Sequence, residues 1–315
     1  MDIRSLILII IVLAMLAIAS IVSIYLKRQK ENVDKNTMVP FISRLIGWWT
    51  LFTILAATLI LEPFVGNSLT CILFACLSFW AMREFLTLTP TRPADHFTMF
   101  LVLFFCTIVQ YVLVAWNLYG LFSIFIPAYA FLLVPACITL SGDPTHFLER
   151  AAKIDMGMLI CIYSLSFAPA ILSIKMPENS NISSIGLLVF FVVIAQISDV
   201  LQYVMSLFPI RHYISRNINS SKTWEGIIGS TLVVMIIGAA LAWATPFTYL
   251  YGALLSFAIS VMGAAGSMTL SAVKRDRGVK DYGTLVEGHS GILDRIDSLC
   301  FAAPIFYHLS QLILK

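Results

Sequence analysis

Ten apolar stretches, each close to the length that crosses a bilayer, dominate this 315-residue chain. A membrane-spanning helix needs about 20 mostly apolar residues, and its backbone must satisfy its own hydrogen bonds inside lipid. The chain is 59% hydrophobic and only 12% charged, unlike a soluble domain. We therefore expect an all-α, polytopic transmembrane bundle of about ten spans. They run approximately over 5–26, 45–62, 68–86, 97–115, 119–140, 154–175, 183–204, 227–245, 247–273 and 298–314.

The first and ninth stretches differ from the others. The apolar run of the first is longer than the core of a secretory signal peptide, and its cations follow the run instead of preceding it. We expect a retained membrane helix there. The ninth is long enough to be tilted or broken, and Gly263, Gly266 and Ser267 permit either arrangement.

Lysine and arginine predict the orientation. If the N-terminus is outside, 17 of the 20 Lys and Arg residues fall in inside loops, and only Arg4, Lys175 and Lys315 lie outside. The positive-inside rule then favours both termini outside and the charged loops in the cytoplasm. We expect a multi-pass protein of the cell (inner or plasma) membrane with its active site on the cytoplasmic side. A transporter would more often place ionisable groups at mid-membrane.

Composition limits the remaining possibilities. We expect one integral-membrane domain over 1–315, with N-terminal spans in 1–190 and the chemistry-bearing motifs in 191–315. The net charge of +3 suits anionic headgroups but gives no argument for nucleic acid. The six cysteines lie in apolar stretches without metal-ligand spacing, so we expect small buried hydrophobes. They are Cys71, Cys76, Cys106, Cys137, Cys161 and Cys300.

The seventh stretch carries a polar face. Asp199 and Gln202, with Gln196 and Tyr203, recur at the i, i+3 and i+4 spacing of one helix side. A carboxylate near the bilayer is costly unless it is paired or metal-bound, so Asp199 is a candidate functional residue and metal ligand. The alternative is an interhelical hydrogen bond near the cytoplasmic end.

A second polar group opens the eighth stretch, over residues 219–226. Hydroxyl, amide and ammonium groups at a helix N-terminus favour phosphate binding. Lys222 is then the phosphate contact, and Glu225 caps the helix or binds metal. The alternative is ordinary N-capping by Ser221 or Thr223 beside a topological lysine.

The densest polar segment lies over residues 271–297. Asp294 and Asp297 are spaced i, i+3 at the mouth of the tenth stretch, as expected for carboxylates that hold Mg²⁺ together with substrate phosphates. Cations to neutralise a triphosphate and glycines to turn the backbone complete the segment. They are Lys274, Arg275 and Lys280, with Gly278, Gly283, Gly288 and Gly291. The alternatives are topological anchoring for the cations and a capped, ion-paired helix start for the aspartates.

Two other features are open to simpler interpretations. Three roles are open for His289: proton relay, phosphate contact and turn capping. We favour phosphate binding, because an ionised phosphate nucleophile needs no strong general base. Arg83 and Glu84 are adjacent in the third stretch, and we expect a structural interfacial ion pair.

At these motifs the sequence resembles the CDP-diacylglycerol synthase (phosphatidate cytidylyltransferase) family. The family signature joins Ser, Lys-Arg and Lys-Asp to a later His-Gly-Gly and an Asp-Arg-aliphatic-Asp. It is matched here by Ser271, Val273, Lys274, Arg275, Lys280, Asp281, Gly283, His289, Gly291, Ile292, Asp294, Arg295, Ile296 and Asp297. Asp199, Tyr203, Lys222, Thr223, Glu225 and Gly226 also occur in the family's order. The resemblance covers roughly 195–300, and the N-terminal half by hydropathy only.

The chain departs from the family pattern at four positions. Glu287 stands where the family usually has Pro or Gly, and Ser290 replaces the first Gly after the histidine. Asn219 and Ser220 stand in place of Ser-Pro. These changes bear on the loop geometry and on the identity of the lipid acceptor, whereas the metal and phosphate groups are kept.

The resemblance implies that CTP and phosphatidate, or a related lipid phosphate, give CDP-diacylglycerol and pyrophosphate with Mg²⁺ required, and it is compatible with a homodimer in the bilayer. The assigned catalytic residues are Lys222, Asp281, His289, Asp294 and Asp297, and the metal ligands are Asp199, Asp281, Asp294 and Asp297. The assigned substrate contacts are Ser271, Lys274, Arg275, Lys280, Arg295, Tyr203 and Thr223.

Two rival functions have distinct signatures. A CTP-dependent polyprenol kinase would transfer the γ-phosphate and release CDP. A lipid or ion transporter would give flux without nucleotide turnover.

Overall fold

The computed structural model describes residues 3–28, 47, 49–62, 68–88, 92–177, 182–206, 212–219, 221–279, 282 and 291–315. Within these residues the fold is built of helices, and paired extended backbone is limited to an isolated antiparallel bridge between Tyr213 and Thr223. The all-α prediction is confirmed.

Eight helices of the described chain are long and apolar enough to cross a membrane. Four are single elements: α3 (Ser68–Leu88), α10 (Ser184–Met205), α12 (Tyr249–Asp276) and α13 (Leu293–Ile313). The other four are composite, because short 3₁₀ or π-helical segments interrupt them. These are Pro93–Ala115 (η1 Pro93–Asp95, α4 His96–Phe100, η2 Leu101–Cys106, α5 Thr107–Ala115), Tyr119–Thr139 (α6 Tyr119–Ile124, η3 Phe125–Ala130, α7 Phe131–Thr139), Phe147–Ser173 (α8 Phe147–Gly157, η4 Met158–Ser164, α9 Leu165–Ala170, η5 Ile171–Ser173) and Trp224–Ala244 (α11 Trp224–Leu241, η6 Ala242–Ala244).

The first two predicted stretches also fall on helices. They are α1 (Ile3–Arg28) and a shorter apolar helix over Trp49–Glu62. In the described residues every predicted apolar stretch is therefore helical, which confirms a multi-pass membrane bundle.

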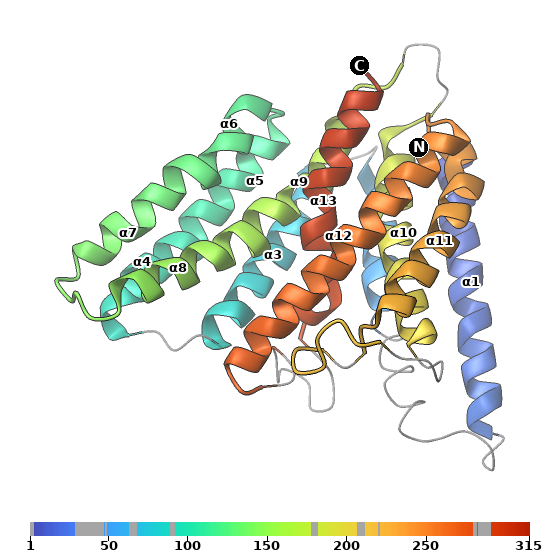
Figure 1. Ribbon diagram of the computed structural model, residues 1–315. Coiled ribbons are helices and arrows are strands. Elements are labelled where there is room, and N and C mark those ends of the chain that lie inside the picture. The colour runs from blue at the N-terminus through green and yellow to red at the C-terminus, as the bar shows by residue number, and fades with distance from the viewer. Residues whose placement is uncertain are drawn as a thin grey trace.

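Figure 1 shows how these helices are arranged. Helices α4 to α8 form one side of the molecule, α1, α10, α11 and α12 form the other, and α3, α9 and α13 lie between them. The start of α1 and the end of α13 lie at one end of the bundle. At the opposite end, called the polar end below, α10 and α12 finish and α11 and α13 begin.

Helix α12 is continuous over 28 residues. Of the two predicted arrangements of the ninth stretch, tilted or broken, the broken one is therefore wrong. Gly266 instead permits close packing on α13. A Cβ added there would lie 2.7 Å from the backbone oxygen of Asp297 and 2.8 Å from the Phe301 ring. Small residues let membrane helices approach in this way.

The cysteine prediction holds for five residues and is wrong for one. All six cysteines are free, and five are buried, but Cys76 is exposed. It lies within α3 on a side that the described residues leave uncovered, where an apolar thiol suits lipid as well as a protein core.

Candidate active site

Asp294, in the first turn of α13, joins the end of α12 to both flanks of the segment between the two helices. Its Oδ1 accepts a hydrogen bond from Lys274 Nζ at 2.6 Å. Its Oδ2 accepts from the backbone N–H of Tyr282 at 2.9 Å and of Gly291 at 3.2 Å. Both oxygens are thus engaged, and the side chain is only 8% exposed.

Asp297 lies one turn further along α13 and meets a carboxylate from another helix. Ser298 donates its backbone N–H to Asp297 Oδ1 at 2.8 Å and its hydroxyl to Asp199 Oδ2 of α10 at 2.5 Å. The charged neighbours of Asp297 are Asp199, Lys222 and Asp294. Packing of α10 against α13 therefore places two carboxylates beside one ammonium group.

Lys222 approaches this pair from the segment before α11. Its Nζ lies 4.0 Å from Asp199 Oδ1 and donates a hydrogen bond to the Gln202 side-chain oxygen. The residue is 7% exposed, so its charge is compensated by these groups instead of by bulk water.

A chain of buried side-chain hydrogen bonds continues from Lys222 into the bundle. Gln202 Nε2 donates to Ser198 Oγ at 3.0 Å, and Ser198 Oγ donates to Ser260 Oγ at 2.8 Å. Thr231 Oγ1 lies 2.9 Å from the same Ser260 oxygen. Of the predicted polar face of α10, Gln202 is thus engaged by Lys222 and by a hydroxyl chain that reaches α11 and α12, whereas Asp199 is engaged by Ser298 of α13.

The segment before α11 combines capping with tertiary contacts. Thr223 is the N-cap of α11 and accepts the Gly226 N–H on its Oγ1 at 3.0 Å. Glu225 accepts hydrogen bonds from the backbone N–H of His212 and pairs with its ring. Asn219 donates its side-chain amide to Ser271 Oγ at 3.0 Å, which ties the segment to the end of α12.

The remaining predicted substrate contacts surround this cluster. Arg275 donates to the backbone oxygens of Ile218 at 3.2 Å and Val279 at 3.3 Å. The guanidinium of Arg295 lies against Gly47, where a Cβ would collide with Nη1. Tyr203 lies on α10 one turn beyond Asp199 and is partly buried.

Tyr282 closes the buried side of the site. Its hydroxyl donates to the Leu270 backbone oxygen at 2.9 Å, and Lys274 Nζ lies 5.5 Å from the centre of its ring. Burial raises the pKa of the Tyr282 phenol well above its usual range, so the hydroxyl stays neutral and acts here as a hydrogen-bond donor.

Glu84 is a site-building residue that the sequence did not reveal. Its carboxylate accepts the backbone N–H groups of Ile292 at 3.0 Å and Leu293 at 2.9 Å, so α3 caps the start of α13. Arg83 lies over the Trp80 ring at 5.3 Å and acts on the Glu84 carboxylate as a nearby charge. The predicted structural role of Glu84 holds, but its hydrogen-bond partners are these backbone groups of α13. The sequence does not indicate this contact, because the partners of Glu84 are 208 and 209 residues away in the chain. Its one local signal is that Glu84 is an acid near the end of its helix.

The site offers oxygen ligands suited to a hard cation. Asp199 and Asp297 bring two like charges together, and Mg²⁺ is commonly held by one or two carboxylates plus substrate phosphates. In the described part of the chain no group of three or more His, Cys, Asp or Glu side chains is arranged to hold a metal. The predicted residues Lys280, Asp281 and His289, and the departures Ser220, Glu287 and Ser290, lie outside the described residues.

The sequence of the chain is similar to the sequences of known proteins. The model of the cytidylyltransferase family matches residues 42–313. The uncharacterized protein YnbB of Escherichia coli K12 is 34% identical over 267 residues, which cover 84% of this chain and 85% of YnbB. The phosphatidate cytidylyltransferase of Synechocystis is 42% identical over 144 residues, 44% of this chain and 47% of that enzyme. The phosphatidate cytidylyltransferase of Bacillus subtilis is 38% identical over 97 residues, 30% of this chain and 36% of that enzyme. The alignments with these two enzymes thus span less than half of their lengths.

Proposed function

We propose, from the premise that the chain belongs to the cytidylyltransferase family, that it condenses CTP with phosphatidate to give CDP-diacylglycerol and pyrophosphate. The observation that carries this proposal is the meeting of Asp199, Lys222 and Asp297 at the polar end of a membrane bundle. A cluster of this kind serves a polyanionic substrate from the water phase and a lipid phosphate from the bilayer.

The reaction is a displacement at phosphorus. An oxygen of the lipid phosphate attacks the α-phosphorus of CTP, and the bond to the bridging oxygen of the β-phosphate breaks, so that pyrophosphate leaves. The nucleophile is already ionised, and the principal task of the protein is to position the phosphates and to balance their charge.

In this proposal the described cations bind the phosphates. The ammonium of Lys222 is held beside the carboxylate pair and contacts a substrate phosphate. Lys274 is fixed by Asp294, and with Arg275 and Arg295 it surrounds the same end of the bundle. Ser271, Thr223 and Tyr203 supply hydroxyl groups around them, and Lys280 and His289 extend the phosphate site in this proposal.

Asp199 and Asp297 are the principal Mg²⁺ ligands in this proposal, and Asp281 and Asp294 contribute further oxygens. Bound Mg²⁺ supplies charge neutralisation and Lewis-acid polarisation of the phosphates. Asp294 also has a second role, since its contacts with Lys274, Tyr282 and Gly291 keep the start of α13 in place.

We further propose ten spans, with both termini outside and the polar end in the cytoplasm of a cell (inner or plasma) membrane. The cation distribution supports this orientation. The common end reached by the start of α1 and the end of α13 supports an even number of crossings (Figure 1).

The test is a product assay with purified protein in detergent. CTP labelled at the α-phosphate or at the γ-phosphate is supplied with Mg²⁺ and phosphatidate, or with a polyprenol. Lipid-linked label from the α-position, with release of pyrophosphate, is the expected result. Lipid label from the γ-position with release of CDP would replace the proposal by a kinase. Absence of nucleotide turnover with every lipid supplied would overturn both enzymatic functions.

A further inference from the structure

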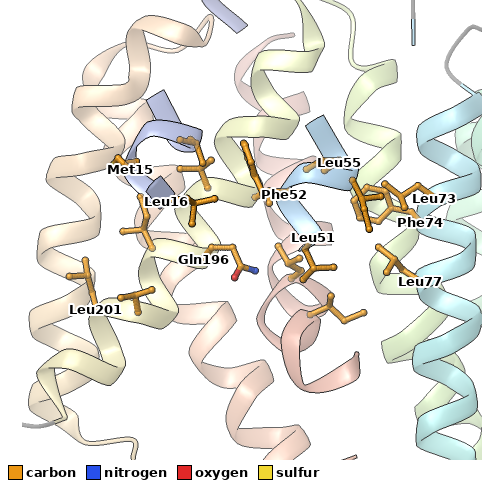
Figure 2. A pocket seen from close by; sticks show the side chains of 18 residues that line it. Met15, Leu16, Leu51, Phe52, Leu55, Leu73, Phe74, Leu77, Gln196 and Leu201 are labelled. Atoms are coloured by element: carbon orange, nitrogen blue, oxygen red, sulfur yellow. The ribbon is translucent and has the colours of Figure 1, made fainter. Parts of the chain in front are cut away.

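An apolar cavity of about 280 Å³ lies beside α10 and α13. Helices α1, Trp49–Glu62, α3, α10 and α13 all line it. Figure 2 shows the Gln196 amide pointing into a space otherwise bordered by aliphatic and aromatic side chains. Among the described residues that line this cavity, Gln196 alone carries a side-chain hydrogen-bonding group.

The cavity begins beside the active-site carboxylates. Ile296, which lines it, precedes Asp297, and Val200, which also lines it, follows Asp199. From there it runs along α10 as far as Val192, about two turns deeper into the bundle. It thus extends from the middle of the bundle, at Leu73 and Val192, toward the polar end, at Leu201 and Ile296.

A cation lies where this cavity approaches the polar end. The Arg295 guanidinium lies against Gly47, next to the helix whose Leu51 and Phe52 line the cavity. Arg295 also directly precedes the cavity residue Ile296. An apolar space with a guanidinium at one end matches a lipid chain with a phosphate at one end.

Helix α1 forms one wall of the cavity through Val12, Met15 and Leu16. This helix precedes residue 42, where the family match begins. Its attachments include two hydrogen bonds: Arg4 donates to the Trp243 backbone oxygen at 3.2 Å, and Ser20 accepts from Trp49 Nε1 at 2.8 Å. Helix α1 thus lies outside the family-matched residues, and hydrogen bonds hold it against them.

We propose that this cavity holds a segment of one acyl chain of the lipid substrate, that Arg295 binds the lipid phosphate at its mouth, and that α1 selects among acyl chains. This proposal rests on the proposed function. Lipid tails are as apolar as the cavity wall, so entry of a chain gains little from the hydrophobic effect. Selection therefore depends on how well the chain fills the space. The volume is just below that of ordinary ligand pockets, which are about 300–1,000 Å³, and it suits part of one chain.

The test fills the cavity from α1. Leu16→Trp places an indole at a lining position that is 8% exposed, and Ile10→Trp, at a position of the same helix that is 54% exposed and does not line the cavity, is the matched control. We expect Leu16→Trp to lower kcat/KM about tenfold for dioleoyl phosphatidate and no more than about threefold for dioctanoyl phosphatidate, because overpacking penalises the longer chain. Ile10→Trp should match wild type with both lipids. An equal loss for both lipids, or no loss, would overturn the proposal.

A second measurement needs no turnover. Phosphatidate with a diazirine in one acyl chain is photolysed with each protein, and labelled peptides are identified. We expect label in peptides of α1 and Trp49–Glu62, lost in Leu16→Trp and kept in Ile10→Trp. Label that is confined to other helices, or that is unaffected by Leu16→Trp, contradicts the proposal. Site-selective labelling without lipid-linked CMP would instead refute the proposed function alone.

Discussion

Lys222 shows at the scale of one residue how a membrane protein keeps a charge in place. Removing an ammonium group from water costs free energy. For Lys222 this is offset by the hydrogen bond to Gln202 and by the Asp199 carboxylate at 4.0 Å. Gln202 is itself held by the hydroxyl chain through Ser198 and Ser260. The ammonium position is therefore set by side chains of α10 and α12.

Lys222→Arg tests whether this position serves a phosphate. Arginine keeps the charge but replaces a compact ammonium with a planar fork that does not fit the same contacts. We expect turnover per CTP to fall about tenfold, equivalent to about 1.4 kcal/mol, with unchanged membrane insertion. Steady-state assays and detergent gel filtration check both expectations. Wild-type turnover in Lys222→Arg and also in Lys222→Ala would remove this residue from the site.

Asp297→Asn tests the metal assignment. The amide is close in shape to the carboxylate but lacks the charge that attracts Mg²⁺, so we expect a loss of at least about a hundredfold in turnover. Asp199→Asn should raise the Mg²⁺ concentration needed for half-maximal activity. Asp276→Asn, exposed at the end of α12, is the control and should leave both quantities unchanged. Turnover of Asp297→Asn within a few fold of wild type at saturating Mg²⁺ would contradict the assignment.

The sequence revealed some of these residues and concealed others for a physical reason. Asp199 stands out locally because an ionisable group in an apolar stretch needs a partner, and Lys222 because it lies in a polar group at a helix start. Which partner it finds depends on packing between distant helices. The Ser298 bridge between Asp199 and Asp297 follows from the contact of α10 with α13, and no spacing rule predicts it.

At the scale of one helix, the start of α13 depends on a carboxylate from α3. Free N–H groups of the first turn carry a partial positive charge, and Glu84 satisfies two of them in a buried position. This contact fixes the start of α13, and with it the positions of Asp294 and Asp297 relative to the rest of the bundle. A helix start without such a cap would move or fray.

Glu84→Gln tests this cap. The amide presents one acceptor and one donor to two N–H groups, so one donor is left unsatisfied at a cost of about 1–3 kcal/mol. We expect lower thermal stability in detergent and a fall in turnover of about tenfold or more, since about 1.4 kcal/mol corresponds to a factor of ten. Glu149→Gln, an exposed acid of α8, is the control, with little expected change. Stability and turnover equal to wild type in Glu84→Gln would show that the cap is dispensable.

Helix α12 shows what the glycines of a membrane helix do. From the sequence, Gly263, Gly266 and Ser267 were compatible with a tilted or a broken helix. The structure selects close packing on α13: the space beside Gly266 is filled by the Asp297 backbone and the Phe301 ring. The neighbouring helix decides between these uses, and the sequence of α12 alone does not identify that neighbour.

Gly266→Ala tests the close contact. A methyl group at 2.7 Å from the Asp297 oxygen must push α12 and α13 apart, and overpacking of this kind costs about 1–3 kcal/mol. We expect a lower unfolding temperature and lower turnover, because the displaced residue is Asp297 itself. Gly120→Ala is the matched control, since nothing lies within 4 Å of its added Cβ. Equal stability of the two variants would show that the contact relaxes without cost.

At the scale of the whole molecule, hydropathy predicted the helices well because each apolar stretch is a local property. All ten stretches fall on helices in the described residues, and the bundle is all-α. Their arrangement was not predicted, since lipid and protein are equally apolar and packing is decided by small residues and polar contacts. Helix α12, which runs between the two ends of the bundle, offers a direct test of the orientation.

Two cysteine variants of α12 test the orientation with matched positions. The helix has 28 residues and a length of about 42 Å, greater than the roughly 30 Å hydrocarbon core, so its ends emerge on opposite sides. Asp276 and Tyr249 are both exposed. In a variant without the six native cysteines, we expect an impermeant maleimide to label Tyr249→Cys in intact cells and Asp276→Cys only after permeabilisation. The cation distribution requires this order, because it places the polar end in the cytoplasm. The reverse pattern would invert the topology and put the proposed nucleotide site on the side of the membrane that lacks CTP.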